Sequence, residues 1–292
     1  MKVALATCAS LPAGDGDDAD VPGALADIGV ESAWLRWGPE TDTDTDTDTD
    51  ADLVVLRSTW DYPERAAEFL SWCESVPVLA NPAGVVKWNL DKAYLVDLIE
   101  AGVPVVPTAV ATPGFDAWPE GEFVVKPTVG AGSRGALRVA AGDHEAAAAH
   151  LAGLGGPALV QPYQADVDHV GETALVFFGG RYSHAFTKGA MLVPDTVTDP
   201  TGLYLVERLD RAEPDAARRR TAEDVLDAAT GLLGVRRADL LYARVDLIPG
   251  VDGRPLLLEL ELVEPSLGFG LADPGAPARF ASAVRAALVD LP

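Results

Sequence analysis

The sequence predicts a mixed α/β and α+β protein with an N-terminal doubly wound domain, a central α+β module and a C-terminal antiparallel-sheet domain. Short apolar runs of strand type alternate with helical repeats in the first part of the chain, as in parallel sheets. Further along, strand-like runs follow one another directly, which favours antiparallel pairing. The length of 292 residues is enough for about two or three domains.

The N-terminal part alternates strands with helices in short steps, as expected for a domain spanning 1–85. Strands are predicted at 2–7, 31–37, 52–58 and 76–80, and helices at 21–29 and 63–75. A Thr-Asp repeat over 41–50 separates the second strand from the third. Its composition predicts a solvated linker.

The central part, 86–163, begins with a predicted helix at 91–101. Strands follow at 105–111, 122–126, 135–140 and 157–161, with an alanine-rich helix at 142–151. The C-terminal part, 164–292, is predicted to contain strands at 173–178, 181–188, 242–249 and 255–263 and helices at 214–233 and 277–288.

Composition and charge exclude several classes of function. The formal net charge of −23 repels nucleic acid and anionic lipid, so we expect neither as a partner. No apolar run has the roughly 18–20 residues of a membrane span, and the first residues are too short for a secretion signal. Cys8 and Cys73 have no metal-type spacing and are expected in the core of a cytoplasmic protein.

Lysine is rare in this chain, which makes the neighbourhood of each lysine informative. The 22 basic residues comprise 17 arginines and five lysines: Lys2, Lys87, Lys92, Lys126 and Lys188. A compact ammonium is suited to a phosphate, whereas an ordinary solvated lysine is the plain alternative.

A glycine-rich segment contains the pattern G-x-G-x-x-G, at Gly130, Gly132 and Gly135. The dinucleotide-binding fingerprint requires a helix after the glycines, but the residues that follow have the pattern of a strand. We therefore predict a flap between two strands, with Ser133 at its tip, whose N–H groups can cover phosphates. Lys126, at the end of the preceding strand, can reach phosphates beneath it. A plain β-turn is the alternative.

Charged residues alternate along two predicted strands near the C-terminus. Period-two spacing puts Arg244 and Asp246 on one strand face, and Glu259 and Glu261 on one face of the next strand. If these strands pair, three carboxylates converge and require cations, and hard oxygen ligands suit Mg²⁺. The alternative is a strand face that merely contacts water.

Together with the run from Leu159 to Tyr163, these motifs resemble the ATP-grasp superfamily along nearly the whole chain. The similarity is greatest to carboxylate–amine ligases such as bacterial glutathione synthetase, D-alanine–D-alanine ligase and the cyclo-ligase of the cycloserine pathway. The resemblance implies an ATP-grasp fold with a central lid and a C-terminal catalytic domain. It also implies ATP and two Mg²⁺ ions, with Mn²⁺ as a possible substitute.

The resemblance assigns roles to individual residues. Contacts to the nucleotide are implied for Lys92, Lys126, Gly130, Gly132, Ser133, Gly135, Gln161, Tyr163 and Glu172. Glu172 would hold the ribose, a role that Asp166 or Asp168 could share. Asp246, Glu259 and Glu261 would hold the metal ions, and Arg244 and Lys188 would be catalytic. Many of these families have Glu-x-Asn where this chain has Glu259 and Glu261, a change that affects metal preference.

The implied reaction activates a carboxylate as an acyl phosphate, releases ADP and phosphate, and joins the acyl group to a nitrogen. The substrate class is a small amino acid or peptide-like acid, in either an intermolecular ligation or a ring closure. Substrate contacts are expected from Arg57, Ser58, Trp60 and Asp61, at the carboxyl end of an N-terminal strand. Ser266 and Gly268, after the metal pair, are further candidates; for the first group, a polar turn is the alternative.

Three other functions are consistent with parts of the sequence. They are a nicotinamide-dependent oxidoreductase, a non-catalytic nucleotide-binding module, and an ATP-grasp enzyme that uses bicarbonate or a thiol. Related ligases are often dimers, so the resemblance implies a homodimer, although the residues themselves indicate no oligomeric state.

Overall fold

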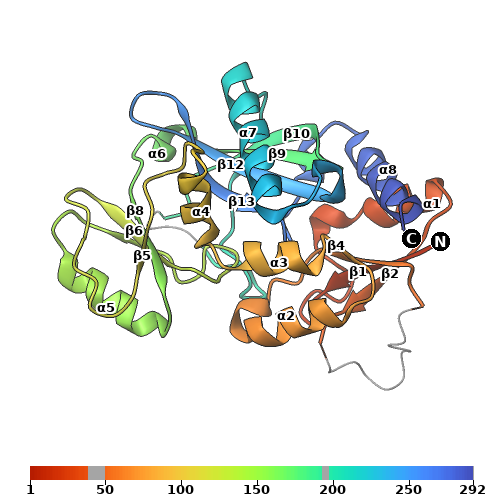
Figure 1. The fold of residues 1–292 in the computed structure, drawn as a ribbon, viewed down its shortest axis with the longest axis horizontal. Coiled ribbons are helices and arrows are strands. Elements are labelled where there is room, and N and C mark those ends of the chain that lie inside the picture. Colours follow the sequence, from red (N-terminus) through yellow and green to blue (C-terminus); the bar gives the residue numbers. More distant parts are fainter. Residues whose placement is uncertain (39–49, 193–196, 292) are drawn as a thin grey trace.

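The computed structural model describes residues 1–38, 50–192 and 197–291. It contains a parallel sheet and two antiparallel sheets, which confirms the predicted fold class (Figure 1). Except for Asp50, the predicted Thr-Asp linker lies outside the described residues. Within the described part of the chain, no helix is long and apolar enough to cross a membrane.

The N-terminal sheet has four parallel strands in the order β2-β1-β3-β4. Along β1, Val3 and Leu5 pack on the side of α1 and α8, whereas Ala4 and Ala6 pack on the side of α2, so both sheet faces are buried. The elements are β1 (Lys2–Thr7), α1 (Val21–Asp27), β2 (Glu31–Arg36), β3 (Leu53–Leu56), α2 (Ala66–Ser75) and β4 (Leu79–Ala80), with 3₁₀ turns at Gly16–Asp18 and Tyr62–Arg65.

The central sheet is antiparallel, in the order β5-β8-β6-β7. Helix α5 covers one face, where Ala147 and Leu151 pack against Phe123 and Val125. Asp143 caps the start of α5 by accepting from the Ala146 N–H, as is typical of aspartate at this position. The elements are β5 (Ala109–Ala111), β6 (Phe123–Pro127), β7 (Leu137–Val139), α5 (His144–Leu154) and β8 (Ala158–Pro162).

The C-terminal sheet has five antiparallel strands in the order β11-β10-β9-β12-β13. One face packs on α7 and the other on α8 and the N-terminal sheet, so the first and last parts of the chain share one core (Figure 1). The elements are α6 (Val167–Val170), β9 (Glu172–Phe178), β10 (Arg181–Lys188), β11 (Leu209–Arg211), α7 (Ala216–Leu233), β12 (Tyr242–Pro249), β13 (Pro255–Glu261) and α8 (Ala276–Val289), with 3₁₀ turns at Arg237–Asp239 and Phe269–Leu271.

Two helices connect the N-terminal sheet to the central one, α3 (Ala83–Leu90) and α4 (Tyr94–Glu100). Helix α3 is not evident from the sequence because its apolar residues do not form a single stripe: Val85 packs toward the C-terminal sheet and Val86 toward the N-terminal one. Helix α4, predicted to begin the central part of the chain, contacts α7 of the C-terminal part. The domain limits at 85/86 and 163/164 stay a prediction.

Side chains from these connecting helices complete the edge of β13. Asn89 accepts from the Leu262 N–H and donates to the Leu260 carbonyl, and the Tyr94 hydroxyl bonds both backbone groups of Leu260. Buried backbone N–H and C=O groups need hydrogen-bond partners. Here these side chains make the hydrogen bonds that a neighbouring strand would otherwise make. They hold the part of β13 that carries Glu259 and Glu261.

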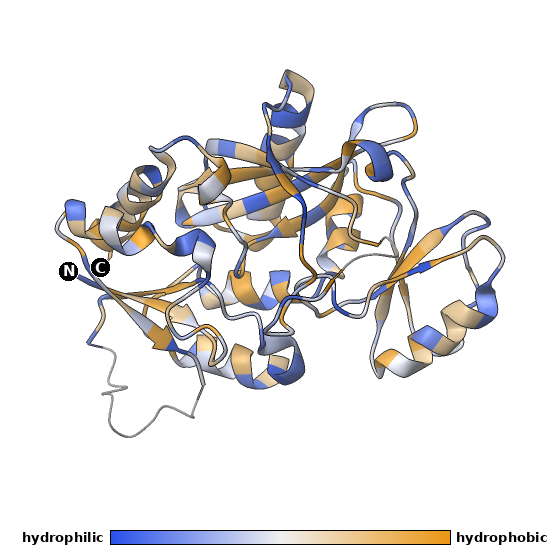
Figure 2. Cartoon of the chain, turned by 180° about the vertical axis from the view of Figure 1, so that it is seen from behind, coloured by the Kyte–Doolittle hydropathy of each residue, from blue (hydrophilic) through white to orange (hydrophobic). Residues whose placement is uncertain are grey.

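Apolar residues are concentrated on the strands of the sheets, and hydrophilic residues on loops and outer helix faces (Figure 2). The sheets therefore supply a rigid frame, and the polar groups described next lie on strands and loops where the sheets approach one another.

Candidate active site

A cavity of about 470 Å³ lies where the three sheets meet, a size typical of small-molecule sites. Residues from all three parts of the chain line it. Among the predicted site residues, the lining includes Trp60, Lys92, Lys126, Gly130, Gly132, Ser133, Gln161, Tyr163, Glu172, Lys188, Arg244, Glu259, Glu261 and Ser266. Asp246 is fully buried beneath them, in contact with Lys188 and Arg244.

Lys92 lies between α3 and α4, beside the glycine-rich loop. Its ammonium donates to the Gly130 carbonyl at 2.6 Å and pairs with Glu259 at 3.2 Å. Its backbone N–H also donates to the Thr128 carbonyl at 2.7 Å. Lys92 therefore connects the loop of the central sheet to the carboxylates of the C-terminal sheet.

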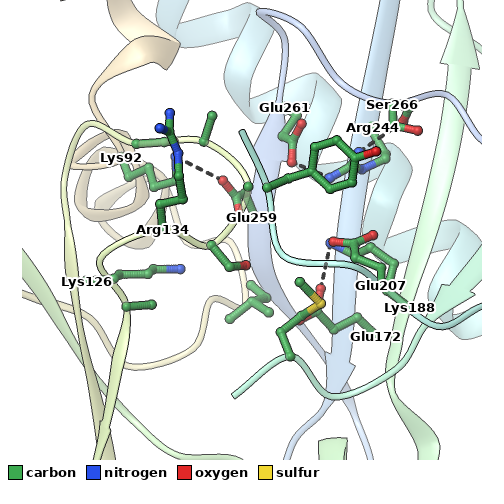
Figure 3. Close-up of a pocket in the computed structure, with 18 of the residues that line it drawn as sticks. Lys92, Lys126, Arg134, Glu172, Lys188, Glu207, Arg244, Glu259, Glu261 and Ser266 are labelled. Atoms are coloured by element: carbon green, nitrogen blue, oxygen red, sulfur yellow. Dashed lines mark hydrogen bonds and ion pairs between the residues drawn. The ribbon is translucent and has the colours of Figure 1, made fainter. Parts of the chain in front are cut away.

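Lys126, at the end of β6, points into the cavity (Figure 3). Within the described residues it has no carboxylate within 4 Å, unlike Lys92 and Lys188. Burial lowers the pKa of Lys126, and the neighbouring Lys92 and Lys188 charges add to this effect against the pull of Glu259. A half-buried cation that has no paired anion in the described part of the chain favours binding of an anionic ligand.

The glycine-rich segment is a strand–turn–strand unit, as predicted, because β6 continues through the turn into the antiparallel β7. Gly132 and Gly135 have positive φ, and Gly132 lies so close to the 203–204 backbone that a Cβ would be 2.6 Å from the Leu203 carbonyl oxygen. Arg134 donates to the Trp60 carbonyl at 3.0 Å and pairs with Glu64 at 3.3 Å. The flap thus contacts the N-terminal domain directly. Gly135 itself does not line the cavity.

Strands β12 and β13 pair as predicted, with Arg244 opposite Glu261 and Asp246 opposite Glu259. Arg244 makes a forked contact with Asp246 at 2.9 Å, donates to the Ser266 carbonyl at 2.9 Å and pairs closely with Glu261. A guanidinium fork fits a carboxylate in this way and is held rigidly by it.

Lys188 ends β10 and lies next to Arg244 (Figure 3). Its ammonium contacts Asp246 at 2.6 Å and Glu172 at 2.7 Å. Glu172 is therefore paired with a cation at the centre of the site. Asp168 accepts from the Tyr163 hydroxyl and pairs with Arg138, and it does not line the cavity. The ribose role of Glu172 stays a prediction.

The carboxylates of β13 differ in pKa because their neighbours differ. Burial acts to raise the pKa of Glu259, but the charges of Lys92 and Lys126 outweigh it and lower the pKa to about 2. Burial raises the pKa of Glu261 to about 8 against the pull of Arg244, and repulsion by Glu259 adds to the shift. Glu259 therefore loses its proton at a much lower pH than Glu261 does.

The predicted metal ligands lie together, but each contacts a cation. Asp246 contacts Lys188 and Arg244, Glu259 contacts Lys92, and Glu261 contacts Arg244. In the described ranges, no group of three metal-type side chains is arranged around one point. The donor set of hard carboxylate oxygens fits Mg²⁺, provided that a ligand draws the lysines away.

The end of the cavity nearest the central sheet is apolar. It is lined by Val106, Val124, Val167, Ile248 and Leu258, with Gln161 and Tyr163 at its edge. Gln161 is buried and donates to the Thr108 hydroxyl at 2.9 Å, and the Tyr163 ring lies under the Arg138 guanidinium. An apolar slot with a polar edge is suited to a planar heterocycle.

The structure corrects the prediction that Arg57, Ser58 and Asp61 contact a substrate. Arg57 is buried in an ion pair with Asp18 at 2.8 Å, and Ser58 is buried against the Thr7 hydroxyl. Asp61 accepts from the Trp37 indole at 2.6 Å. None of the three lines the cavity, and Arg57 is covered by Tyr242 and by Phe280 of α8.

Trp60, Ser266 and Gly268 have different environments. Trp60 and Ser266 line the cavity, and the Trp60 indole donates to the Glu264 carbonyl at 2.9 Å. Gly268 does not line it; its N–H donates to Asp17 at 2.7 Å.

Several residues that line the cavity could not be predicted as site residues, because nothing in their local sequence distinguishes them. Asp17 lies in an acidic run, and Tyr204 and Glu207 lie in a polar stretch between two strands. Glu264 lies in the predicted substrate loop, and burial raises its pKa to about 7 against the pull of Lys92. Their placement depends on contacts between distant segments, such as the Trp60–Tyr204 ring pair.

Comparison with known proteins identifies close relatives. Residues 3–81 match the family model described as the N-terminal domain of D-cycloserine synthetase DcsG. The chain is 45% identical over 249 residues to the cycloserine biosynthesis protein DcsG of Streptomyces lavendulae, a match covering 79% of this chain and 81% of that protein.

Solved structures extend the comparison to the whole fold. The crystal structure of D-cycloserine synthetase DcsG matches with a TM-score of 0.86 and 38% identity, covering 99% of this chain and 100% of that one. D-alanine–D-alanine ligase from Bacillus anthracis complexed with ATP shares the fold at a TM-score of 0.64 and 14% identity, covering 99% and 97%. The ATP-grasp ligase PsnB, solved with Mg and ADP, matches at 0.61 and 20%, covering 98% of each chain.

Proposed function

The chain belongs to the DcsG family of ATP-grasp carboxylate–amine ligases, and from this membership we propose that it closes a ring within a small amino-acid-like substrate. The substrate carboxylate is phosphorylated by ATP, giving an acyl phosphate and ADP. A nitrogen of the same molecule then attacks the acyl carbon, and the C–O bond to phosphate breaks. Phosphate leaves, and a cyclic amide remains.

The single observation that best supports nucleotide binding is the position of Lys126. Its ammonium, which pairs with no carboxylate among the described residues, points into the cavity under a flap rich in backbone N–H groups (Figure 3). The apolar slot beside Gln161 and Tyr163 continues from it. We infer that the adenine occupies the slot and the phosphates extend toward Lys126 and Lys92, which together offset their charge.

Asp246, Glu259 and Glu261 are the side chains that would hold Mg²⁺. Their carboxylate oxygens are hard ligands, and the cations that contact them now are Lys92, Lys188 and Arg244. Nucleotide phosphates attract the same lysines and leave Glu259 available for a metal ion. When bound, Mg²⁺ would neutralise charge on the phosphates during transfer.

Arg244 and Lys188 are placed to stabilise charge at the reacting carboxylate. Both are buried, and both contact Asp246, which holds their positive charges close to the place where negative charge would develop. The flap, closed through Arg134 onto the Trp60 carbonyl, would exclude the water that hydrolyses an acyl phosphate. No protein nucleophile takes part in this sequence.

The DcsG relative supports ring closure over coupling of two molecules. That relative is a D-cycloserine synthetase, and cycloserine contains its carbonyl carbon and a nitrogen in one ring. The test described next also detects a reaction that uses bicarbonate or a thiol as the acceptor.

The test is a substrate panel assayed for ADP release, with products identified by mass. The panel contains serine-derived acids with a nitrogen on the side-chain oxygen, the same acids as methyl esters, and simple amino acids with added amines. We expect ADP release only with a free carboxylate, and a cyclic product without any added amine. Release that requires an added amine, bicarbonate or thiol would contradict ring closure.

A further inference from the structure

The loop after β13 is built as a carboxylate-binding nest. The Ser266 hydroxyl and the backbone N–H groups of Leu267, Gly268 and Gly270 all point to one place. Gly268 has φ +63°, which turns the backbone so that its N–H groups converge. Converging backbone N–H groups of this kind form an anion-binding concavity.

A carboxylate from the chain itself already fills this nest. Asp17 Oδ2 accepts from the Ser266 hydroxyl at 3.2 Å, from the Leu267 N–H at 3.1 Å and from the Gly268 N–H at 2.7 Å. Its second oxygen accepts from the Gly270 N–H at 3.2 Å. Both Asp17 and Ser266 line the cavity, so the filled nest forms part of its wall.

The nest lies next to the reaction centre. Arg244 donates to the Ser266 carbonyl at 2.9 Å, and Arg244 also holds Asp246 and Glu261. A carboxylate bound in the nest would therefore lie beside the group that is activated.

Asp17 is anchored so that a substrate cannot easily replace it. The next residue, Asp18, is buried in an ion pair with Arg57 at 2.8 Å, and both side chains are at most 2% exposed. Arg57 in turn lies 5.6 Å from the Tyr242 ring centroid and 5.8 Å from that of Phe280. An anchored internal carboxylate has a high effective concentration and outcompetes a free one.

We infer that Asp17 determines acceptor specificity by filling the acceptor-carboxylate nest, so that the attacking nitrogen carries no carboxylate of its own. This inference rests on the proposed function, and it explains why that reaction is a ring closure. The only carboxylate of the substrate is the one that is activated.

The first test asks whether the nest can be opened. Asp17→Ala removes the internal carboxylate, and Asp17→Asn keeps its shape without its charge. Asp20→Ala is the matched control, because Asp20 is exposed and makes no capping hydrogen bond at the start of α1. Thermal unfolding is measured in sodium formate and in sodium chloride at equal ionic strength.

We expect Asp17→Ala to lower Tm and formate to restore part of the loss, with a smaller effect of the same sign in Asp17→Asn. Formate should give wild type and Asp20→Ala no comparable gain over chloride. A formate effect in wild type equal to that in the Asp17 variants would overturn the inference, because the nest would then be open already. Absence of any difference between formate and chloride in the variants would overturn it too.

The second test measures a ratio of two products. A loss of stability in the variant would therefore not by itself produce the expected result. Wild type and Asp17→Asn are given a serine-derived acid without the ring-closing nitrogen, together with either D-alanine or D-alaninamide. We expect the ratio of D-alanine to D-alaninamide products to rise at least about tenfold in the variant. A wild type that prefers D-alanine, or equal ratios in both proteins, overturns the inference. If wild type releases no ADP with any acid, the proposed function fails, whereas the formate test still decides the role of Asp17.

Discussion

Lys126 is the residue on which nucleotide binding depends most directly. We expect Lys126→Ala to raise the Kd for ATP about 10- to 100-fold, because a charge-assisted contact to phosphate contributes about 1.5–3 kcal/mol. Titration calorimetry measures this without turnover. Lys87→Ala is the control, since Lys87 is exposed and pairs only loosely with Glu74 at 3.6 Å. Equal affinities of wild type and Lys126→Ala would contradict the placement of the phosphates.

Glu261 gives metal binding a dependence on pH. Its pKa is raised to about 8, so below that pH the carboxyl holds a proton that a metal ion must displace. We expect Mg²⁺ binding in the presence of ADP to release a proton at pH 7 and none well above pH 8. Calorimetry in two buffers of different ionisation enthalpy measures this release. Glu261→Gln should abolish it, and release that is the same at both pH values would contradict the assignment.

Some of these residues could be predicted from the sequence, and others could not. Arg244 and Glu259 lie on two strands whose alternation is visible in the sequence, so their convergence followed from local pattern, whereas the meeting of Lys126 with them followed only from the resemblance to ATP-grasp ligases. Arg57 also ends a strand, but α8 and Tyr242, far along the chain, cover it and turn it into a buried support. Asp17 has no sequence signal because its role depends on a loop about 250 residues away.

At the scale of elements, the closed position of the flap depends on a close contact between Gly132 and the backbone at Leu203. A Cβ at Gly132 would be 2.6 Å from the Leu203 carbonyl oxygen, whereas at Gly142 it would meet nothing within 4 Å. Both glycines have positive φ, so alanine costs about 1 kcal/mol of backbone strain at either position. We expect Gly132→Ala to raise KM for ATP roughly tenfold and Gly142→Ala to leave it unchanged. Similar KM values in steady-state assays of the two variants would show that the contact is irrelevant to closure.

The edge of β13 is an element that side chains complete. Asn89→Ala leaves the buried Leu262 N–H without its side-chain partner, at about 1–3 kcal/mol, whereas the Leu260 carbonyl keeps its hydrogen bond from the Tyr94 hydroxyl. We expect urea unfolding to show a loss of about 2 kcal/mol. Ser71→Ala, which removes an exposed hydrogen bond on α2, should change stability by less than about 0.5 kcal/mol. A loss no larger than that of Ser71→Ala would mean that the strand edge is supported in another way.

Helix α3 shows where element prediction fails. Asn81 and Pro82 have the pattern of a domain end, yet Pro82 is the N-cap of a helix that is buried on two sides. A helix without an apolar stripe has no helical periodicity to detect. The Asn81 side chain bonds the Tyr242 and Leu262 carbonyls, so its role too lies in contacts distant in sequence.

For the molecule as a whole, the site exists only because three parts of the chain meet. The N-terminal sheet and the C-terminal sheet share one hydrophobic core, and the central sheet contributes Lys126 and the flap. Charge is distributed in the same way: the chain has a net charge of −23, yet Lys92, Lys126, Lys188 and Arg244 gather at the cavity. This local concentration of cations is what allows an acidic protein to bind a polyphosphate.

The most direct test of the central claim follows the oxygen atoms of the substrate. The acid that gives ADP release is prepared with ¹⁸O in its carboxylate and converted fully by wild type with ATP. Phosphorylation of the carboxylate predicts one ¹⁸O in the phosphate released for each ADP formed, together with a cyclic product that retains the other. Unlabelled phosphate, or release of AMP and pyrophosphate, would contradict activation through an acyl phosphate.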